Sequence, residues 1–506
     1  MRVIDESSEI AGVRLAPDES RRIKIYLALA AVAALRLWVA PMTASLWLDE
    51  AVTFWSVCKG IGPSISRSQF WPGQNLLYTL IAAAAVRVGG PSEIALRLPS
   101  LFAAFGTAWL LFRLGTRLFD RETGVLALVV FASLQEMSKT AANARPYALG
   151  LLVVVGSMLQ LVRWLDTGRM RNMLGYAGLA AAILYFHYLF APAYLVQAAY
   201  ALYRIRSGGP VRWYRLIAAA AFIGVLISPL ILNAILVSRG SSKLVFLPTP
   251  DFGALVSSIM PAALGPGIFA GLLLGYILCR RVSVSQPAMA SDTAVLLLGW
   301  LLVPIVTLFA VSRLTGFKLF ADKYYLPSML GLALLAGWGI RTLLPEKVRV
   351  CVSLCVVLAA IASFGSHHLW VNPHLEDWRA AAQAVHAANL GDKTPVLVRP
   401  GLIESAKVTW DFDIDPDSPL LCPLSKYPIP GRIVLIPLRL DSDNIRYMED
   451  VSSKVLEPAS QFVFVTRDQG DTFTPWLLGR FSHEGFVASK LGHADGVTAT
   501  LFRRDR

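Results

Sequence analysis

The sequence predicts a mainly α-helical protein that crosses a membrane about eleven times and ends in a small α/β domain. Three observations support this fold class. Of the 506 residues, 55% are hydrophobic and only 16% are charged, and soluble domains do not carry so many long apolar runs. Basic clusters alternate with acidic positions between these runs. No run long enough to span a bilayer follows residue 370.

The apolar runs are expected to form a membrane bundle over residues 23–369, after a cytoplasmic N-terminal tail of residues 1–22. The first run is not a cleavable signal peptide, because it follows a polar stretch and lacks a small-residue cleavage site. Several runs are short and need tilt to span the hydrocarbon. The predicted spans are 23–42, 96–113, 123–137, 146–162, 172–188, 189–203, 214–237, 262–279, 292–311, 324–341 and 349–366.

Charges between the runs predict how the bundle is oriented. One set of loops is dense in arginine and lysine and has few acids, as cytoplasmic loops do. The alternate set contains Asp49, Glu50, Glu136 and Asp322, and we expect it on the outer face. The N-terminus then lies in the cytoplasm and the C-terminus outside. Topology and anionic lipid explain the net charge of +13, so nucleic acid is not an expected partner.

Residues 76–89 are apolar but fall about a turn short of a minimal span, and they include Arg87. If this stretch crossed the membrane, every later loop would invert and the basic clusters would face outward. We therefore predict a helix lying at the outer surface. It belongs to a large first outer loop of residues 43–95.

Residues 370–506 predict an extracytoplasmic α/β domain. Residues 376–390 have the apolar spacing of an amphipathic helix. Short β-branched runs, which are typical of strands, follow at 396–398, 433–436 and 462–465.

Asp49 and Glu50 follow the first span in an apolar stretch rich in tryptophan and phenylalanine. Acids near a bilayer are costly unless they face water, a partner or a substrate. Asp49 is either a solvated loop acid or a general base, since a nearby carboxylate can take the proton of an attacking hydroxyl. Glu50 either orients Asp49 or binds a cation.

Cations recur at the predicted outer ends of later spans. Arg145 either holds a phosphate, which the guanidinium fork suits, or extends to lipid head groups. The lipid interpretation is favoured for its neighbour Lys139. Lys323 and Tyr324 form a second cluster, which fits phosphate contact and anchoring at the membrane interface equally well.

His187 lies at a predicted outer turn between two spans. It either contacts an acceptor or packs as a hydrogen-bonded turn residue, and the packed role is the commoner one. Glu93 and Arg97 are expected to pair with each other or to mark the start of a helix, and we assign them no chemistry.

Six motifs occur in a fixed order: Asp49-Glu50, Glu93-Ile94-Ala95-Leu96-Arg97-Leu98-Pro99-Ser100, Asn143-Ala144-Arg145-Pro146-Tyr147-Ala148-Leu149, His187-Tyr188, Asp322-Lys323-Tyr324-Tyr325-Leu326-Pro327 and Glu376-Asp377-Trp378-Arg379. This ordered set resembles the lipid-linked glycosyltransferases of the type-C fold. That group holds the protein O-mannosyltransferases and the aminoarabinose transferases of lipid A. No single motif is specific, but the set covers most of the chain.

The resemblance implies an enzyme that moves a sugar, with inversion, from a polyprenyl-phosphate donor to an acceptor hydroxyl. The acceptor is a glycan, a lipid or a protein, and the reaction takes place at the outer face of a bacterial cytoplasmic membrane. The resemblance places the catalytic base at Asp49, with Glu50 beside it. The expected substrate-binding residues are Arg145, Lys323, Tyr324, Lys139, Tyr147 and His187. No cofactor is expected and no metal site is indicated.

The chain departs from the family at three places, one of which is Lys323, where an arginine is common. Gln74-Asn75-Leu76 stands where members often carry His-Pro-Pro, and Ala142-Asn143-Ala144-Arg145 stands where they often carry Gln-Glu-Ala-Arg. The missing histidine and glutamate indicate a divergent branch with its own substrates. Three other functions stay open: a ligase or polymerase with a lipid-diphosphate donor, a transporter or flippase, and a scaffold without activity. The acids gather at one face and no repeat is visible, which counts against transport.

Overall fold

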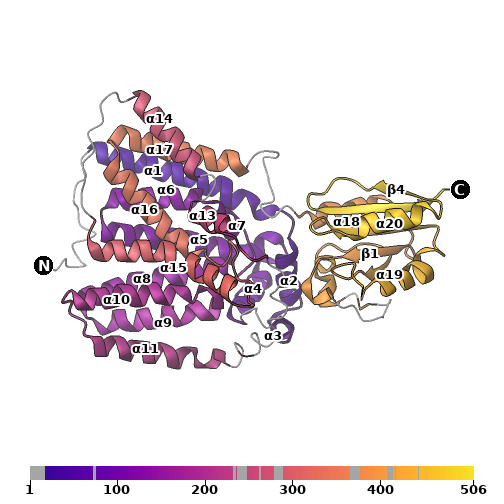
Figure 1. Ribbon diagram of the computed structural model, residues 1–506, viewed down its shortest axis with the longest axis horizontal. Helices are drawn as coiled ribbons and strands as arrows, with labels where there is room; N and C mark the ends of the chain where they lie inside the picture. Colours follow the sequence, from indigo (N-terminus) through magenta and orange to yellow (C-terminus); the bar gives the residue numbers. More distant parts are fainter. Residues whose placement is uncertain are drawn as a thin grey trace.

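The computed structural model describes residues 17–71, 76–231, 235, 248–260, 264–278, 289–364, 376–406, 414–415, 417–442 and 444–505. Most of the predicted N-terminal tail, together with Gln74, Asn75, His367, His368 and His374, lies outside the described residues. Helices fill the first two thirds of the chain, and a smaller part with a β-sheet projects from one end of the helical bundle (Figure 1).

The helical bundle contains α1 (Pro17–Ala34), η1 (Leu35–Val39), η2 (Ala40–Thr43), α5 (Glu93–Leu118), α6 (Arg121–Ser133), α7 (Gln135–Ala141), α8 (Tyr147–Thr167), α9 (Met170–Phe186), η3 (Tyr188–Phe190), α10 (Pro192–Arg206), α11 (Trp213–Ile227), η4 (Ser228–Leu230), α13 (Phe252–Ile259), α14 (Leu264–Leu278), α15 (Ser291–Leu314), α16 (Pro327–Leu343) and α17 (Glu346–Phe364). Three further helices, α2 (Leu48–Val57), α3 (Ile61–Ser68) and α4 (Leu76–Gly89), lie at the end that faces the sheet (Figure 1).

Each of the eleven predicted apolar segments contains helical residues. Five helical stretches among the described residues are long and apolar enough to cross a membrane, and a sixth span arises if α13 and α14 count as one bent unit. The five are Pro17–Thr43, Glu93–Leu118, Tyr147–Thr167, Trp213–Leu230 and Ser291–Leu314. The count of about eleven spans therefore stays a prediction.

Small residues let the bundle helices pack closely. A Cβ atom added at Gly337 of α16 would lie 2.6 Å from the backbone nitrogen of Ala127 in α6. One added at Gly331 of the same helix would lie 2.7 Å from the backbone nitrogen of Leu301 in α15. Membrane helices associate through close van der Waals packing, which residues without bulky side chains permit. These glycines therefore hold α16 between α6 and α15.

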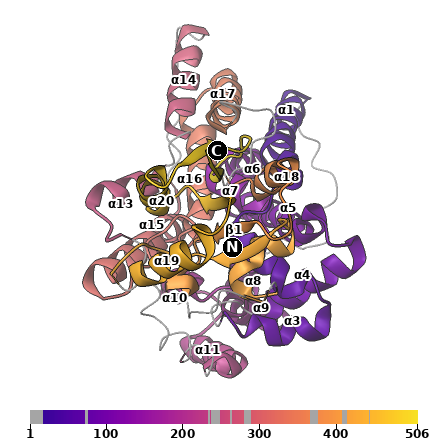
Figure 2. The ribbon, with the colours of Figure 1, turned by 90° about the vertical axis from the view of Figure 1, so that its right-hand side faces the viewer.

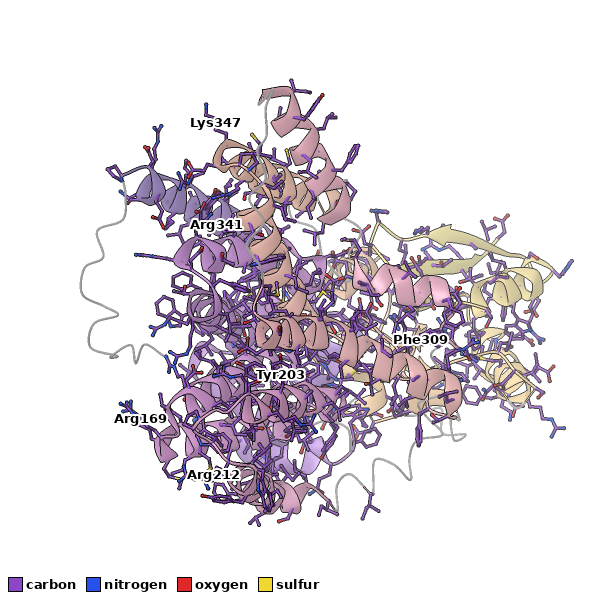
Figure 3. The ribbon with its side chains drawn as sticks, turned by 60° about the vertical axis from the view of Figure 1, so that its left-hand side comes forward. Arg169, Tyr203, Arg212, Phe309, Arg341 and Lys347 are labelled. Atoms are coloured by element: carbon purple, nitrogen blue, oxygen red, sulfur yellow. The ribbon has the colours of Figure 1, made fainter. Side chains whose placement is uncertain are left out.

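The basic loops gather at the end of the bundle that lies away from the sheet. Four basic residues in or beside three different loops lie on the same side of the molecule in Figure 3: Arg169, Arg212, Arg341 and Lys347. The same end holds the buried carboxylate of Glu122, whose ion pairs with Arg341, Arg349 and Arg22 have N–O distances of 3.0, 3.3 and 3.5 Å. These pairs join α16, α17 and α1 to α6.

The C-terminal part is an α/β unit. Its sheet has the order β2-β1-β3-β5-β4, in which β1 pairs in parallel with β2 and β3, and β5 pairs antiparallel with β3 and β4. The predicted strands at 396–398 and 462–465 fall within β1 and β3, the one at 433–436 overlaps β2 and extends one residue beyond it, and the predicted helix contains α18. The elements are α18 (Trp378–Ala387), β1 (Pro395–Arg399), η6 (Ile403–Ala406), η7 (Pro419–Ser425), β2 (Arg432–Leu435), α19 (Ile445–Val451), η8 (Ser452–Leu456), β3 (Gln461–Arg467), α20 (Phe473–Ser482), β4 (Phe486–Lys490) and β5 (Val497–Arg504).

The two-residue alternation of β3 gives the sheet two buried faces. Phe462 and Phe464 join an aromatic core with residues of α20 and β5. Val463 and Val465 point to the opposite face and join a core that includes Trp378 of α18. Seen from the side of the sheet, this unit stands in front of the bundle (Figure 2).

The placement of α4 leads to a test of orientation. Reporter domains fused after residues 90 and 210 should report the outer face and the cytoplasm, respectively, because arginines crowd the second loop and stay inside. Alkaline phosphatase activity reports the outer face, and green fluorescence reports the cytoplasm. A fusion after residue 345 is the control and should behave like the one at 210. Phosphatase activity at residue 210 would show that the chain has the opposite orientation.

Candidate active site

Asp49 lies in the first turn of α2, one of the helices at the end of the bundle that faces the sheet (Figure 1). Its carboxylate Oδ2 is 3.2 Å from the Nζ atom of Lys323, in the loop before α16. Both side chains are partly exposed, at 27% and 29%. The loop before α16 thus brings a cation to an acid that lies 274 residues earlier in the chain.

Arg145 enters the same cluster from the loop before α8. Its guanidinium donates to the backbone carbonyl of Asp49 at 3.3 Å and approaches the hydroxyl of Thr53 at 3.5 Å. The hydroxyl of Ser100 in α5 donates to the carbonyl of Arg145 at 3.1 Å and fixes the loop. Two cations from separate loops therefore flank one carboxylate.

Aromatic rings border these charges. The His187 ring lies 5.1 Å from the ring of Tyr147 and 5.5 Å from that of Tyr324, measured between centroids. The ammonium of Lys323 lies 5.5 Å from the Tyr324 ring and 5.8 Å from that of Trp47, within the range of cation–π attraction. The Nδ1 atom of His187 accepts the N–H of Leu189 at 3.2 Å, so Nε2 is the ring nitrogen that can donate a hydrogen bond.

The charges around Asp49 keep it ionised. Burial alone would raise the pKa of this carboxyl, but the positive charges of Lys323 and Arg145 lower it to about 2. The negative charge of Asp49 in turn raises the pKa of Lys323, against the effect of burial. Both members of the pair are charged at neutral pH in the ligand-free protein.

Glu50 points away from this cluster and into the protein. Its side chain is fully buried and binds the guanidinium of Arg97, with Nε–Oε1 and NH2–Oε2 distances of 2.7 and 2.5 Å. It also accepts the backbone N–H of Ala144 at 2.7 Å and that of Trp47 at 3.4 Å. These contacts place Glu50 in a buried network behind Asp49, where its charge is paired with the guanidinium of Arg97.

Glu93 is the first residue of α5, as the expectation of a helix start had it, whereas Arg97 pairs with Glu50 and not with Glu93. Its guanidinium also donates to the carbonyls of Ala44 and Ser45 at 2.7 and 3.0 Å. Glu93 instead accepts from Arg379 at 2.8 Å and from the hydroxyl of Tyr427 at 2.9 Å, both in the C-terminal part. Tertiary packing overrides the local spacing of the two residues.

Lys139 lies beside the cluster, but it faces a different acid. Its Nζ atom is 3.2 Å from the Oδ2 atom of Asp322, the residue before Lys323. The structure therefore groups Asp49, Arg145, Lys323, Tyr147, His187 and Tyr324, which we call the Asp49 cluster. Glu50 lies behind it and Lys139 at its side. Within the described ranges, no three His, Cys, Asp or Glu side chains are arranged to hold a metal ion.

Three participants were missed in the sequence. Asn143, at a position where the family often has glutamate, accepts the indole N–H of Trp47 at 3.3 Å and so fixes a ring of the cluster. Glu376 and Arg467 approach from the C-terminal part, where the carboxylate of Glu376 accepts the N–H of Leu48 at 3.0 Å. The motif that opens the terminal domain contained Glu376, but no sequence signal indicated Arg467.

The buried pair of Glu50 and Arg97 gives a stability prediction. Glu50→Gln or Arg97→Gln should each lower the free energy of unfolding by about 3–5 kcal/mol, because each leaves a buried charge without its partner. The double variant should lose less than the sum of the two. Unfolding in detergent measures this, with Glu457→Gln as the control, since its pair with Arg480 is about one-third exposed and contributes little. Additive losses would contradict the prediction.

Residues 74–232 match the family described as dolichyl-phosphate-mannose-protein mannosyltransferase. The match includes α4 to α11, with Arg145 and His187. No curated protein matches the chain.

The fold has clear counterparts among solved structures. The crystal structure of ArnT from Cupriavidus metallidurans in the apo state superposes with a TM-score of 0.56 at 10% identity, covering 96% of this chain and 98% of that chain. ArnT from the same organism bound to undecaprenyl phosphate gives 0.54 at 11% identity, with 94% and 97% covered. At such identities the likeness concerns the fold.

The predicted resemblance is thereby confirmed, over one segment by the family match and over nearly the whole chain by the fold. The bundle with its terminal α/β unit is the ArnT-like architecture, and the helices mark a multi-pass membrane protein. The chain therefore has the fold of ArnT over nearly its whole length and is similar to the dolichyl-phosphate-mannose-protein mannosyltransferase family over residues 74–232.

Proposed function

We propose that the protein transfers a sugar from a polyprenyl-phosphate donor to an acceptor hydroxyl, with inversion at the anomeric carbon. The observation that carries this proposal is the Asp49 cluster, where one carboxylate and two cations from three separate segments meet. A base and a phosphate site side by side are what a single displacement at a lipid-linked sugar requires.

Asp49 acts as the base in this proposal. The acceptor oxygen attacks C1 of the sugar, its proton passes to the Asp49 carboxylate, and a new C1–O bond forms. The bond between C1 and the phosphate oxygen breaks, and its electron pair leaves with the lipid phosphate. One displacement inverts the anomeric centre and needs no covalent sugar–enzyme intermediate.

Lys323 and Arg145 hold the phosphate. The donor is a phosphodiester with one negative charge, and the departing polyprenyl phosphate gains a second. Fixed cations directed at this oxygen stabilise the charge as it develops, which lowers the barrier. The guanidinium of Arg145 suits two phosphate oxygens, whereas Lys323 supplies a compact point charge. The Nε2 hydrogen of His187 adds a neutral donor beside them.

Donor binding also prepares the base. A carboxyl whose pKa is about 2 is a poor proton acceptor near neutral pH, because effective bases have a pKa close to the working pH. The donor phosphate competes with Asp49 for Lys323 and offsets the positive charge of Arg145. The pKa of Asp49 then rises toward its ordinary value. Asp49 therefore becomes a stronger base when the donor is in place.

The reaction side is proposed to be the outer face of a bacterial cytoplasmic membrane. The Asp49 cluster and the basic loops lie at opposite ends of the bundle (Figures 1 and 3). Since arginine-rich loops stay in the cytoplasm, the cluster and the C-terminal unit belong outside. The ArnT structure with undecaprenyl phosphate supports a polyprenyl-phosphate partner for this fold. The acceptor is a hydroxyl-bearing glycan, lipid or protein.

Replacement of Asp49 tests the base. Asp49→Asn should reduce turnover by at least about 100-fold, the usual scale of general base catalysis, and should leave the melting temperature in detergent close to that of the wild type. The assay measures sugar transfer in proteoliposomes with a panel of polyprenyl-phosphate sugars. Asp450→Asn, which removes an exposed pair with Lys454, is the matched control. Full turnover in folded Asp49→Asn would exclude Asp49 as the base.

The same assay separates the donor classes. Polyprenyl-monophosphate sugars should be substrates, and lipid-diphosphate oligosaccharides should not. Transfer from diphosphates alone would instead favour the oligosaccharide ligase considered from the sequence.

Replacement of the two cations tests the phosphate site. Lys323→Gln and Arg145→Gln should each weaken the binding of undecaprenyl phosphate by about 10- to 100-fold, since a hydrogen bond to a charged group contributes about 1.5–3 kcal/mol. The dissociation constant is measured with labelled lipid and purified protein. Lys454→Gln keeps the same change of charge far from the cluster and should bind like the wild type. Unchanged affinity in both cluster variants would place the phosphate elsewhere.

A further inference from the structure

The segment between η2 and α2, residues 43–48, is held by the C-terminal unit. Arg379 donates from its side chain to the carbonyl of Thr43 at 3.0 Å and from its backbone N–H to the hydroxyl of Ser45 at 3.2 Å. The N–H of Leu46 donates to the hydroxyl of Tyr427 at 2.9 Å. This is the segment that leads directly into Asp49.

The last of these contacts is made by Glu376. The first N–H groups of an α-helix have no partner within the helix. At the start of α2, the Oε2 atom of Glu376 accepts the N–H of Leu48 at 3.0 Å. A carboxylate at this end also interacts favourably with the helix dipole. Glu376 thus caps the first turn of α2, one residue before Asp49.

Glu376 is itself fixed in place. Its side chain is only 4% exposed, and its Oε1 atom lies 2.6 Å from the Nε atom of Arg467, at the end of β3. The indole of Trp378 donates to Oε2 at 3.4 Å. A chain of contacts therefore runs from the sheet, through Arg467 and Glu376, to the backbone beside Asp49.

The rest of α2 packs on the same unit. Leu48, Ala51, Val52 and Trp55 form a buried cluster with Leu402 and Cys422 of the C-terminal part. The indole N–H of Trp55 donates to the carbonyl of Asp417 at 2.8 Å. One face of the helix that carries Asp49 is thereby built against the C-terminal unit and not against the bundle.

We propose that Glu376 is a positioning residue for Asp49: it sets the first turn of α2 and is itself held by Arg467, so the C-terminal unit is a structural part of the active site. This inference rests on the proposed function, in which Asp49 is the base.

The test measures turnover and donor binding separately in the full-length protein. Glu376→Ala should lower kcat by about 10- to 100-fold, as loss of a supporting contact commonly does, and leave the dissociation constant for undecaprenyl phosphate at the wild-type value. Glu376→Gln keeps an oxygen that can accept the N–H of Leu48, so it should recover most of kcat. Glu457→Gln, in an ion pair elsewhere in the same unit, should match the wild type in both measurements.

A double-variant cycle tests the order of the contacts. Because Arg467 acts through Glu376, the kcat of Glu376→Ala/Arg467→Ala should equal that of Glu376→Ala alone. Losses that multiply, or a weaker lipid affinity in place of a lower kcat, would overturn the proposal. If Glu376→Ala does not fold, Arg467→Ala and Glu376→Gln decide: wild-type kcat in Arg467→Ala, or a kcat of Glu376→Gln as low as that of Arg467→Ala, overturns it.

Asp49→Asn separates this inference from the function on which it rests. Wild-type turnover in Asp49→Asn would show that Asp49 is not the base, and the proposed function would fail together with the inference. An inactive Asp49→Asn with a fully active Glu376→Ala leaves the proposed function standing and refutes the positioning role alone.

Discussion

The buried ion pair between Glu50 and Arg97 is the interaction on which the rest of the site depends. Glu50 binds Arg97 in α5 and the backbone N–H of Ala144 before α8, while Arg97 gathers the carbonyls of Ala44 and Ser45. The start of α2 with Asp49 and the loop before α8 with Arg145 are therefore both fixed to α5 from behind. A buried charge without a partner costs several kcal/mol, so the pair permits only arrangements that keep all three together.

The second constraint on the site is the N-terminus of α2. Glu50, on the side of the bundle, accepts the N–H of Trp47, and Glu376, in the C-terminal unit, accepts the N–H of Leu48. The carboxylate of Asp49 does not cap the helix and instead contacts Lys323. Glu50 and Glu376 thus hold the backbone at the start of the helix, whereas Asp49 contacts a cation from a distant loop.

The parts of this arrangement that follow from the alternation of membrane spans could be predicted from the sequence. Charged residues at the ends of apolar runs share a membrane face when the spans alternate, so Asp49, Arg145 and Lys323 could be placed together without knowledge of packing. The contacts between residues within the site could not be predicted from the sequence. Arg97 lies four residues after Glu93, which favours a local pair on a helix, yet each finds a distant partner. Arg467, at the end of β3, and Glu376, just before α18, meet through tertiary packing that no pattern in either segment encodes.

Charge balance explains why this cluster can do without a second acid. Asn143 stands where the family often has glutamate and serves Trp47 as a neutral acceptor, while Lys139 and Asp322 neutralise each other. The remaining charges, Asp49 against Lys323 and Arg145, leave the ligand-free site at +1. A lipid phosphodiester brings it to zero. In the proposed reaction, Asp49 carries the acceptor proton after transfer and the lipid phosphate carries two negative charges, so the sum is again zero. Because the reaction moves charge within a site whose total stays fixed, another acid there would weaken donor binding and add nothing to the chemistry.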